Sequence, residues 1–424
     1  MKTLSIDDPR FLERSTRPTM LDRLARRIVR DKLGALDQGC VVLHERGETA
    51  VFGNSDDENG LTVSVTVNSP AFYSDIAFGG LVGSGEAYIN GYWDCDEVDT
   101  LVRIILQNRE VMETMDAGVA VLLTPVKKLF HWLNRNTRAG SRRNIAAHYD
   151  LGNDFYALWL DPEMMYSCAY YPEPNSGLDE AAVAKLDRIC RKLNLKPDDS
   201  VVEIGTGWGG FAIHAAQNYG CHVTTTTIST EQYEYARARI INEGLEDRIT
   251  LLKNDYRDLE GHYDKLVSIE MIEAVGHEYL DTFFETCAAL LKPDGEMLLQ
   301  SITILDQRYE KAKKTVDFIK RYVFPGGFLP SNTAINNSMT RVTDLRAIHM
   351  EDIGLHYAKT LSDWRERFFA HIAEVRQQGY TEEFIRLWEF YLCYCEAAFT
   401  ERSIGNVQLH AIKPDARPLM HTAL

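Results

Sequence analysis

The sequence predicts an α/β protein whose larger part is a doubly wound, mostly parallel, Rossmann-like sheet, preceded by a smaller α/β or mostly β domain. Two observations predict the sheet. An apolar run at 201–204 leads directly into a glycine-rich turn at 205–210, which is typical of a strand, a tight turn and a helix. Short apolar runs at 249–252, 265–269 and 297–302 then recur at the spacing of strand–helix units.

Length and composition describe an ordinary globular protein. The 424 residues suffice for two or three domains, and the net charge of −16 opposes a nucleic-acid partner because a phosphate backbone would be repelled. Eight scattered cysteines form no C-x-x-C pair, which indicates reduced thiols and no metal site. There is no signal-peptide pattern and no apolar run of ~18 residues. We therefore expect a cytoplasmic protein, peripherally associated with the membrane.

Residues 1–125 are expected to form an amino-terminal, lipid-interacting domain. Residues 21–33 place Leu21, Leu24 and Val29 on one helical stripe, with arginines largely outside it. Such a basic amphipathic helix either covers a small domain or contacts a membrane surface, and both alternatives stay open. Further along, 61–67 alternates apolar and polar residues as a strand does, and a helix is expected near 98–108.

A basic linker is expected at 126–145, before a second domain at 146–424. No acidic residue occurs from 117 to 149, whereas six lysines and arginines are interleaved with aromatic and aliphatic residues. Such a segment can attract anionic lipid headgroups by ~1 kcal/mol per basic residue. The alternative is a solvated connection between the domains.

The glycine-rich turn predicts a ligand but does not identify it alone. Gly205, Gly207 and Gly210 match the pattern G-x-G-x-x-G, which serves nicotinamide cofactors and S-adenosylmethionine alike. Glu203 would repel a pyrophosphate but could meet a cation or a hydroxyl. The next strand, 221–228, also lacks the acid that a dinucleotide's ribose requires at its end. Both features favour S-adenosylmethionine.

Other polar residues fall at the expected ends of parallel strands, where ligands of such sheets bind. They are Asp255, Glu270, Glu273 and Gln300. The tyrosine-rich segment at 161–171 is expected to form a lid in front of the glycine turn, joined to the first strand by a helix near 179–193. A last strand at 407–412 is expected to complete the sheet edge.

Five motifs in consistent order give a family resemblance. They are 148–154, 166–170, 203–209, 227–232 and 322–327. Together they resemble the cyclopropane fatty acid synthases and mycolic acid methyltransferases, over roughly residues 140–412. The passage at 80–96 also resembles the amino-terminal domain of the phospholipid-acting bacterial members. The resemblance implies the Rossmann-like fold of S-adenosylmethionine methyltransferases.

The resemblance also implies site residues. With the turn and the strand ends, the expected cofactor site comprises Tyr166, Ser167, Glu203, Gly205, Gly207, Gly209, Thr227, Ile228, Ser229, Gln232, Tyr256 and Arg257. A bicarbonate ion acting as the base would be surrounded by Cys168, Glu273, Gln300, the backbone of Ile302, and Tyr357. Cys395 corresponds to a late cysteine proposed as an active-site residue in some members. The chemistry forms no covalent enzyme intermediate, so it needs no thiolate there.

The implied reaction transfers a sulfonium methyl group to an isolated cis double bond, which requires close alignment in a dry pocket. The resulting carbocation loses a proton, from the new methyl to close a cyclopropane ring, or from the chain to leave a branched alkene. The sequence departs from the well-known members at Gln300, where their Leu-His-Thr-Ile motif carries histidine. A glutamine amide donates a hydrogen bond but carries no proton near pH 7. This resembles the branch that includes enzymes making methylene- or methyl-branched fatty acids.

The predicted function is transfer of a methylene or methyl group from S-adenosylmethionine to the double bond of unsaturated acyl chains of membrane phospholipids, giving cyclopropane fatty acids. Three alternatives stay open. They are methylene- or methyl-branched products from the same substrate, methylation of a small amine or phenol with Glu273 or His148 as base, and a non-catalytic lipid-binding module. The expected partners are a phospholipid bilayer surface, a second copy in a homodimer, and a downstream reductase.

Overall fold

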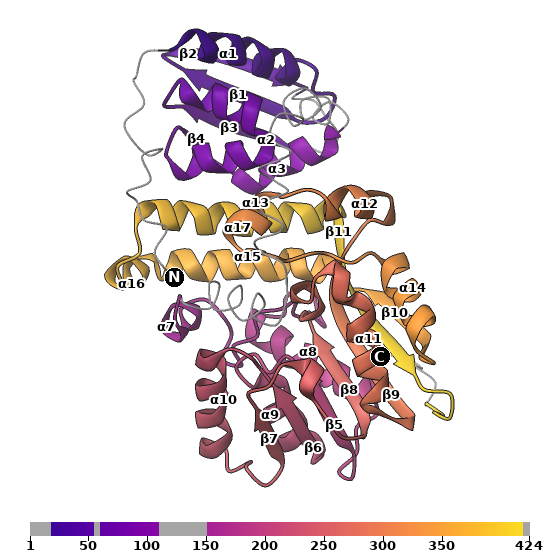
Figure 1. The fold of residues 1–424 in the computed structure, drawn as a ribbon. Helices are drawn as coiled ribbons and strands as arrows, with labels where there is room; N and C mark the ends of the chain where they lie inside the picture. The colour runs from indigo at the N-terminus through magenta and orange to yellow at the C-terminus, as the bar shows by residue number, and fades with distance from the viewer. Residues whose placement is uncertain (1–17, 55–59, 110–150, 419–424) are drawn as a thin grey trace. The chain divides into compact units, whose positions relative to one another are not determined.

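The chain divides into two compact units, and the computed structural model describes residues 18–54, 60–109 and 151–418 (Figure 1). The first unit comprises residues up to 133 together with 316–323 and 372–403, and the second comprises the remainder. Two late segments that a linear division assigns to the second domain therefore belong to the first unit. The expected basic linker at 126–145 lies outside the described residues.

The first unit has an α/β fold built around one β-sheet. Its strands are β1 (Cys40–Glu45), β2 (Glu48–Gly53), β3 (Thr62–Val67) and β4 (Trp93–Cys95), in the order β2-β1-β3-β4. β1 and β3 run parallel, whereas the two outer pairs are antiparallel. The predicted strand at 61–67 is confirmed as β3, and its alternation places Val63, Val65 and Val67 in the core.

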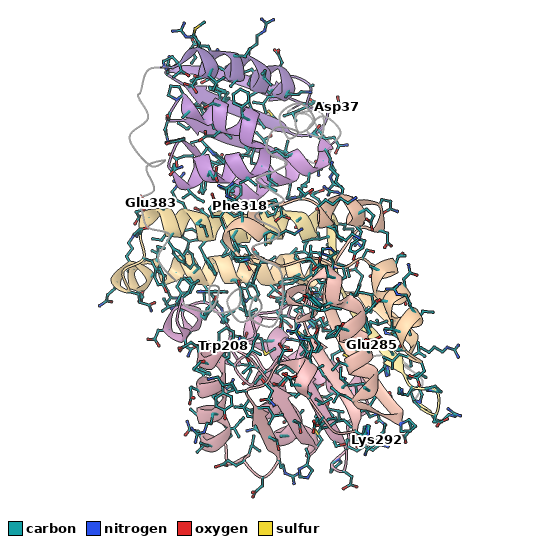
Figure 2. The ribbon with its side chains drawn as sticks, viewed as in Figure 1. Asp37, Trp208, Glu285, Lys292, Phe318 and Glu383 are labelled. Carbon is teal, nitrogen blue, oxygen red and sulfur yellow. The ribbon has the colours of Figure 1, made fainter. Side chains whose placement is uncertain are left out.

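Helices complete the first unit. They are α1 (Met20–Leu33), α2 (Ala71–Ile89), α3 (Val98–Gln107), α13 (Phe318–Tyr322), α16 (Ile372–Gln377) and α17 (Glu382–Thr400). A Cβ at Gly85 in α2 would lie 2.6 Å from the ring of Phe318, which Figure 2 labels, so glycine lets α13 approach α2 closely. The predicted helix at 21–33 is confirmed as α1. Its buried side includes Ala25 and Val29, while Leu21 and Leu24 are exposed.

The second unit contains a seven-stranded sheet in the order β10-β11-β9-β8-β5-β6-β7. Its strands are β5 (Ser200–Ile204), β6 (His222–Thr226), β7 (Ile249–Leu252), β8 (Tyr263–Ile269), β9 (Leu291–Ile304), β10 (Arg346–Asp352) and β11 (Ile404–Ile412). β5 to β9 are parallel, whereas β11 pairs antiparallel with both β9 and β10. The mostly parallel sheet is confirmed.

The expectation that 407–412 forms the sheet edge is wrong, because β10 lies outside β11. β10 alternates exposed and half-buried residues. Its sequence, Arg-Ala-Ile-His-Met-Glu-Asp, has none of the apolar density that marked the central strands. An edge strand covered mainly on one face has little need of that density.

Helices cover both faces of this sheet, as doubly wound folds require. They include α8 (Leu178–Lys192), α9 (Gly210–Tyr219), α10 (Thr230–Asn242), α11 (Leu280–Ala289), α14 (Asn332–Val342) and α15 (Gly354–Ala370). The short helix α12 (Asp306–Lys313) contacts α14 and buries none of its own residues. Leu298 of β9 packs in the core shared with α8 and α9, and its neighbour Leu299 packs in the opposite core with α11 and α14. Among the described residues, every helix is too short or too polar to cross a bilayer.

Candidate active site

The glycine turn follows β5 at the carboxyl edge of the sheet. Gly205, Gly207 and Gly209 have φ values of 105°, 54° and 93°, in the region that favours glycine. The N–H of Gly205 donates to the carbonyl of Thr226 over 3.1 Å, so β6 holds the turn in place. A Cβ at Gly205 would lie 3.2 Å from the side chain of Met271, which follows β8. The turn and the end of β8 are therefore neighbours.

Glu203 lies buried beside this turn, with 2% of its surface exposed. One oxygen accepts a hydrogen bond of 2.6 Å from Thr225, and burial raises the pKa of the carboxyl group to about 8. A cation or a hydroxyl donor above the turn would stabilise the ionised form. The residues present therefore fit a cationic sulfonium cofactor with a ribose and an ammonium group.

The corner after β6 carries hydroxyl and amide groups instead of an acid. Thr227 donates to the side-chain oxygen of Gln232 over 2.9 Å, and Ser229 caps α10 by accepting from the N–H of Gln232. Ile228 is half-buried between them. These residues lie at the strand end where the cofactor site was predicted.

Tyr256 and Arg257 lie after β7, in the short 3₁₀ helix Tyr256–Asp258. Asp255 accepts from Arg257 at both carboxylate oxygens, over 2.8 and 2.6 Å, so the guanidinium is oriented by its neighbour. The ring of Tyr256 packs edge-on against Phe283, 5.7 Å between centroids. Both predicted cofactor residues are thus held in fixed positions at the ligand edge of the sheet.

The segment 161–171 packs against the glycine turn. This is the position expected of a lid, which the sequence predicted for this segment. A Cβ at Gly210 would lie 2.5 Å from the sulfur of Met165 and 2.9 Å from the carbonyl of Glu163. Trp208, labelled in Figure 2, donates to the side chain of Asn153 over 2.7 Å. The ring of Tyr166 lies 5.3 Å from that of Trp364. Glycine at 210 is therefore needed because this segment contacts its backbone.

Glu270, directly after β8, gathers donors from four parts of the second unit. Its Oε1 accepts from the backbone N–H of Cys168 (3.0 Å), Nε2 of Gln300 (2.9 Å) and Nδ2 of Asn406 (2.7 Å). Its Oε2 accepts from the hydroxyl of Tyr357 over 2.8 Å. Four hydrogen-bond donors that converge in this way form a strong binding site for an anionic group, and here that group is the carboxylate of Glu270.

A buried chain of hydrogen bonds determines the orientation of the Gln300 amide. The Nζ of Lys192 donates to Oε1 of Gln408 (2.7 Å), whose Nε2 donates to Oε1 of Gln300 (3.0 Å). An ammonium can only donate and the carboxylate of Glu270 only accepts, so both intervening amides have one orientation. Gln300 consequently presents N–H donors to Glu270.

Glu273 lies beside Glu270 in the 3₁₀ helix Ile272–Ala274. Its Oε1 accepts from the backbone N–H of Ile302 (2.6 Å) and the hydroxyl of Ser301 (3.0 Å). Its Oε2 is buried and has no hydrogen-bond partner among the described residues. Burial, and then the charge of Glu270, raise the pKa of Glu273 to about 8. Near neutral pH this side chain is therefore mostly a neutral acid that can donate from Oε2.

Neither predicted cysteine acts as a thiolate in this arrangement. The thiol of Cys168 is fully buried and directed at the carbonyls of Ala169 and Ile353, so only its backbone N–H serves Glu270. Burial raises the pKa of Cys168 well above its ordinary value. Cys395 lies on α17 in the first unit, where burial also raises the pKa of its thiol. The cluster that the second unit brings together does not include Cys395.

Sequence reasoning missed a buried lysine at this site. Lys185 of α8 is completely buried, and its Nζ donates to the hydroxyl of Ser167 over 2.9 Å. Burial lowers its pKa to about 8, although Glu270, Asp161 and Glu203 favour its charged form. The available signal was its position on the apolar stripe of the helix, four residues after Ala181 and four before Ile189. Asn406 and Gln408 were also not predicted, and Glu270 was noted only as a polar residue at a strand end.

The residues expected to surround bicarbonate do not fit an additional anion here. The N–H of Cys168, the amide of Gln300 and the hydroxyl of Tyr357 already serve the carboxylate of Glu270, and the N–H of Ile302 serves Glu273. A further anion would also meet the carboxylate of Glu270 at close range. His148, the alternative base, lies outside the described residues. Within residues 18–54, 60–109 and 151–418, His, Cys, Asp and Glu form no group suited to a metal ion.

Comparison with known proteins agrees with this geometry. The family model described as mycolic acid cyclopropane synthetase matches residues 136–409, which contain the glycine turn, Glu270 and Glu273. The chain belongs to this family. It is 38% identical to tuberculostearic acid methyltransferase UfaA1 of Mycobacterium tuberculosis, over 76% of each chain. It is also 38% identical to the cyclopropane-fatty-acyl-phospholipid synthase of Escherichia coli, over 80% of this chain and 85% of that one.

Solved structures of family members share the fold. The cyclopropane synthase MmaA2 from Mycobacterium tuberculosis aligns with a TM-score of 0.60 at 28% identity, covering 64% of this chain and 98% of that one. Mycolic acid cyclopropane synthase CmaA1, in a complex with SAH and CTAB, aligns with the same TM-score and coverage at 30% identity. This family member is thus an S-adenosylmethionine-dependent methyltransferase of the cyclopropane-fatty-acyl-phospholipid synthase type.

Proposed function

We propose that this enzyme transfers a one-carbon unit from S-adenosylmethionine to the double bond of an unsaturated acyl chain carried by a membrane phospholipid, with a cyclopropane fatty acid as the first product. The observation that supports the proposal is the close approach of Gly205 to Met271, the residue after Glu270, where an added Cβ would lie 3.2 Å from the Met271 side chain. A methyl donor and a proton acceptor are both required by such a transfer. Here the residues suited to each lie at adjacent strand ends.

The residues take different parts in this reaction. S-adenosylmethionine supplies an electrophilic methyl group, and we assign its binding to the glycine turn, Glu203 and the corner formed by Thr227 and Gln232. Segment 161–171 covers the turn and excludes water from it. The cluster at Glu270 receives the proton that the alkylated chain must lose.

The proposal predicts label in the lipid acyl chains. The protein is incubated with methyl-labelled S-adenosylmethionine and vesicles of an oleoyl phospholipid, and the fatty esters are analysed by mass spectrometry. We expect each modified chain to gain one CH₂ unit. Vesicles of a saturated phospholipid of equal chain length are the matched control, and label in both would contradict attack on a double bond. Label appearing only in soluble amines or phenols would support the alternative methyltransferase function instead.

A branched product is the second candidate, because Gln300 replaces a histidine and because UfaA1 is named a tuberculostearic acid methyltransferase. A cyclopropane and an exocyclic methylene have the same mass, so NMR of the fatty ester distinguishes them. Ring protons would support the first product, and vinylidene protons would support the second. A saturated methyl branch requires a further reductant, which a partner reductase would have to supply.

We also propose that α1 contacts the bilayer surface. Met20, Leu21 and Leu24 are 88%, 54% and 55% exposed, and the exposed residues Arg23 and Arg27 share the helix. Exposed apolar side chains beside basic ones suit an interface of anionic phospholipids, and this pattern contrasts with the protein's net charge of −16. The protein would then act from the membrane surface as a peripheral enzyme.

Replacing both Leu21 and Leu24 by Glu is expected to weaken binding to anionic vesicles by about 10- to 100-fold, since each leucine loses part of ~1.5–3 kcal/mol of apolar burial. Co-sedimentation measures the affinity. Val183→Glu with Ile241→Glu is the matched control, because these exposed residues lie in the second unit and add the same charge. Equal losses in both double variants would contradict a specific role for α1.

A further inference from the structure

We propose that the carboxylate of Glu270 occupies the anion site of this enzyme and replaces bicarbonate as the proton acceptor. This inference deepens the proposed function and rests on it. It starts from the four hydrogen bonds that converge on one side chain. Three of their donors are residues that the family resemblance assigned to a bicarbonate ion, namely Cys168, Gln300 and Tyr357. The protein thus provides, from its own chain, the carboxylate that those donors bind.

The backbone at Glu270 shows that this placement is specifically maintained. Its φ is 50°, a region that residues other than glycine, asparagine and aspartate rarely adopt. Its N–H donates to the carbonyl of Gln300 over 2.8 Å, so the strained residue is anchored to β9 while its side chain turns into the cluster. Unfavourable backbone geometry of this kind persists mainly where the surrounding contacts enforce it. The contacts that enforce it here are those to the carboxylate.

The two carboxylate oxygens differ in their remaining capacity. Oε1 accepts three hydrogen bonds, from Cys168, Gln300 and Asn406, which leaves it no lone pair for a further donor. Oε2 accepts one, from Tyr357, and keeps a lone pair. Oε2 is therefore the atom that can receive a proton.

The proton transfer balances without any other reactant. The double bond's electron pair forms the new carbon–carbon bond as the bond from sulfur to the methyl carbon breaks, leaving a cation on the neighbouring chain carbon. A C–H bond of the transferred methyl group then breaks, and its electron pair closes the ring at the cationic carbon. The proton goes to Oε2 of Glu270, which becomes a carboxylic acid and later releases it to water. For the exocyclic methylene, a hydride instead shifts from the methylated carbon to the cationic carbon, and the transferred methyl group then loses its proton to the same oxygen as its C–H electron pair forms the double bond.

The neighbouring acid supports this assignment of charge. Glu273 lies close enough for the charge of Glu270 to affect it. Among the described residues it accepts two hydrogen bonds, both at Oε1, whereas Glu270 accepts four. When two carboxyl groups lie side by side, repulsion favours the state in which only one of them is ionised. The carboxylate with four hydrogen-bond donors, Glu270, is therefore the base.

The test compares the native protein with Glu270→Gly and Glu270→Gln in buffer depleted of carbon dioxide, with and without added bicarbonate. Glycine accepts the positive φ and opens the anion site, whereas the glutamine amide still fills it. We expect native turnover on oleoyl vesicles to be unchanged by bicarbonate. Glu270→Gly should lose about 100-fold or more and regain activity with bicarbonate or formate, whereas Glu270→Gln should stay inactive with either. Glu285→Gln, an exposed position on α11 that Figure 2 labels, is the control and should behave as native.

A second readout does not depend on turnover. Bicarbonate should raise the thermal unfolding midpoint of Glu270→Gly but not that of the native protein, because only the variant has a vacant anion site. Native turnover that falls without carbon dioxide and returns with bicarbonate would overturn the proposal. So would a folded Glu270→Gly protein that stays active without any anion, or one whose activity and unfolding midpoint both ignore bicarbonate. If the native protein modifies no lipid at all, the proposed function fails, while the unfolding midpoints still decide whether Glu270 fills an anion site.

Discussion

Gly205→Val is expected to reduce turnover by about 100-fold or more and to abolish measurable binding of S-adenosylmethionine. Gly205 has a φ of 105°, which a β-branched residue adopts only under strain. A Cβ there would also lie 3.2 Å from Met271, the residue after Glu270. Relieving that contact displaces either the cofactor turn or the acid cluster, and misplacement by about 1 Å costs about 100-fold in rate.

Gly379→Val is the matched control for this variant. Gly379 has a φ of 91° on an exposed turn of the first unit, and a Cβ there meets no atom within 4 Å. Both variants share the backbone strain, of order 1–3 kcal/mol. Only Gly205→Val adds the contact with Met271. Isothermal titration with the cofactor separates them, and equal cofactor affinities in the two variants would contradict the contact between the turn and the end of β8.

The sequence predicted the central strands and the cofactor turn well because burial on both faces leaves a strong local pattern. β5, β7 and β8 are short, apolar and followed by polar or glycine residues, so their ends could be placed within a few residues. The same reasoning failed for β10, whose half-buried edge position imposes little apolar pattern. It also gave no sign that α13 and α17 join the first unit, because that grouping depends on contacts between segments more than 200 residues apart in sequence, such as Tyr88 with Glu389.

The active site was predicted as a set of strand ends, but its charge distribution was not. Lys185 and Lys192 lie inside a helix whose other buried residues are mostly apolar, and nothing local shows that their ammonium groups reach buried acceptors. Glu270 was recognised only as a residue near a strand end. Its carboxylate accepts from Tyr357, which was expected to bind bicarbonate, and from Asn406, which was not predicted. Both residues come from distant parts of the chain. Such a convergence is a property of the folded sheet and not of any one segment.

Glu273→Ala is expected to reduce turnover by about 100-fold or more, whereas Glu273→Gln should stay within about threefold of native at pH 7. The pKa of Glu273 is raised to about 8, so the native side chain is mostly a neutral acid at pH 7. Glutamine keeps an acceptor for the N–H of Ile302 and a donor in place of the Oε2 proton. Alanine removes both and leaves the N–H of Ile302 without its partner.

The protonation state of Glu273 is checked by the pH dependence of turnover and of stability in the native protein and in Glu273→Gln. Above pH 8 native Glu273 ionises beside Glu270, so native turnover should fall there while that of Glu273→Gln falls less. For stability, the folded-state pKa of about 8 exceeds the ordinary value of 4.5, so the native state binds more protons than the unfolded state between these values. The free energy of unfolding of the native protein, relative to Glu273→Gln, should therefore decrease as pH rises from 4.5 to about 8, which urea denaturation at several pH values measures. A Glu273→Gln protein that is inactive at pH 7, with a stability difference that does not change over this range, would mean that Glu273 is ionised in the folded enzyme and competes with Glu270 as the base.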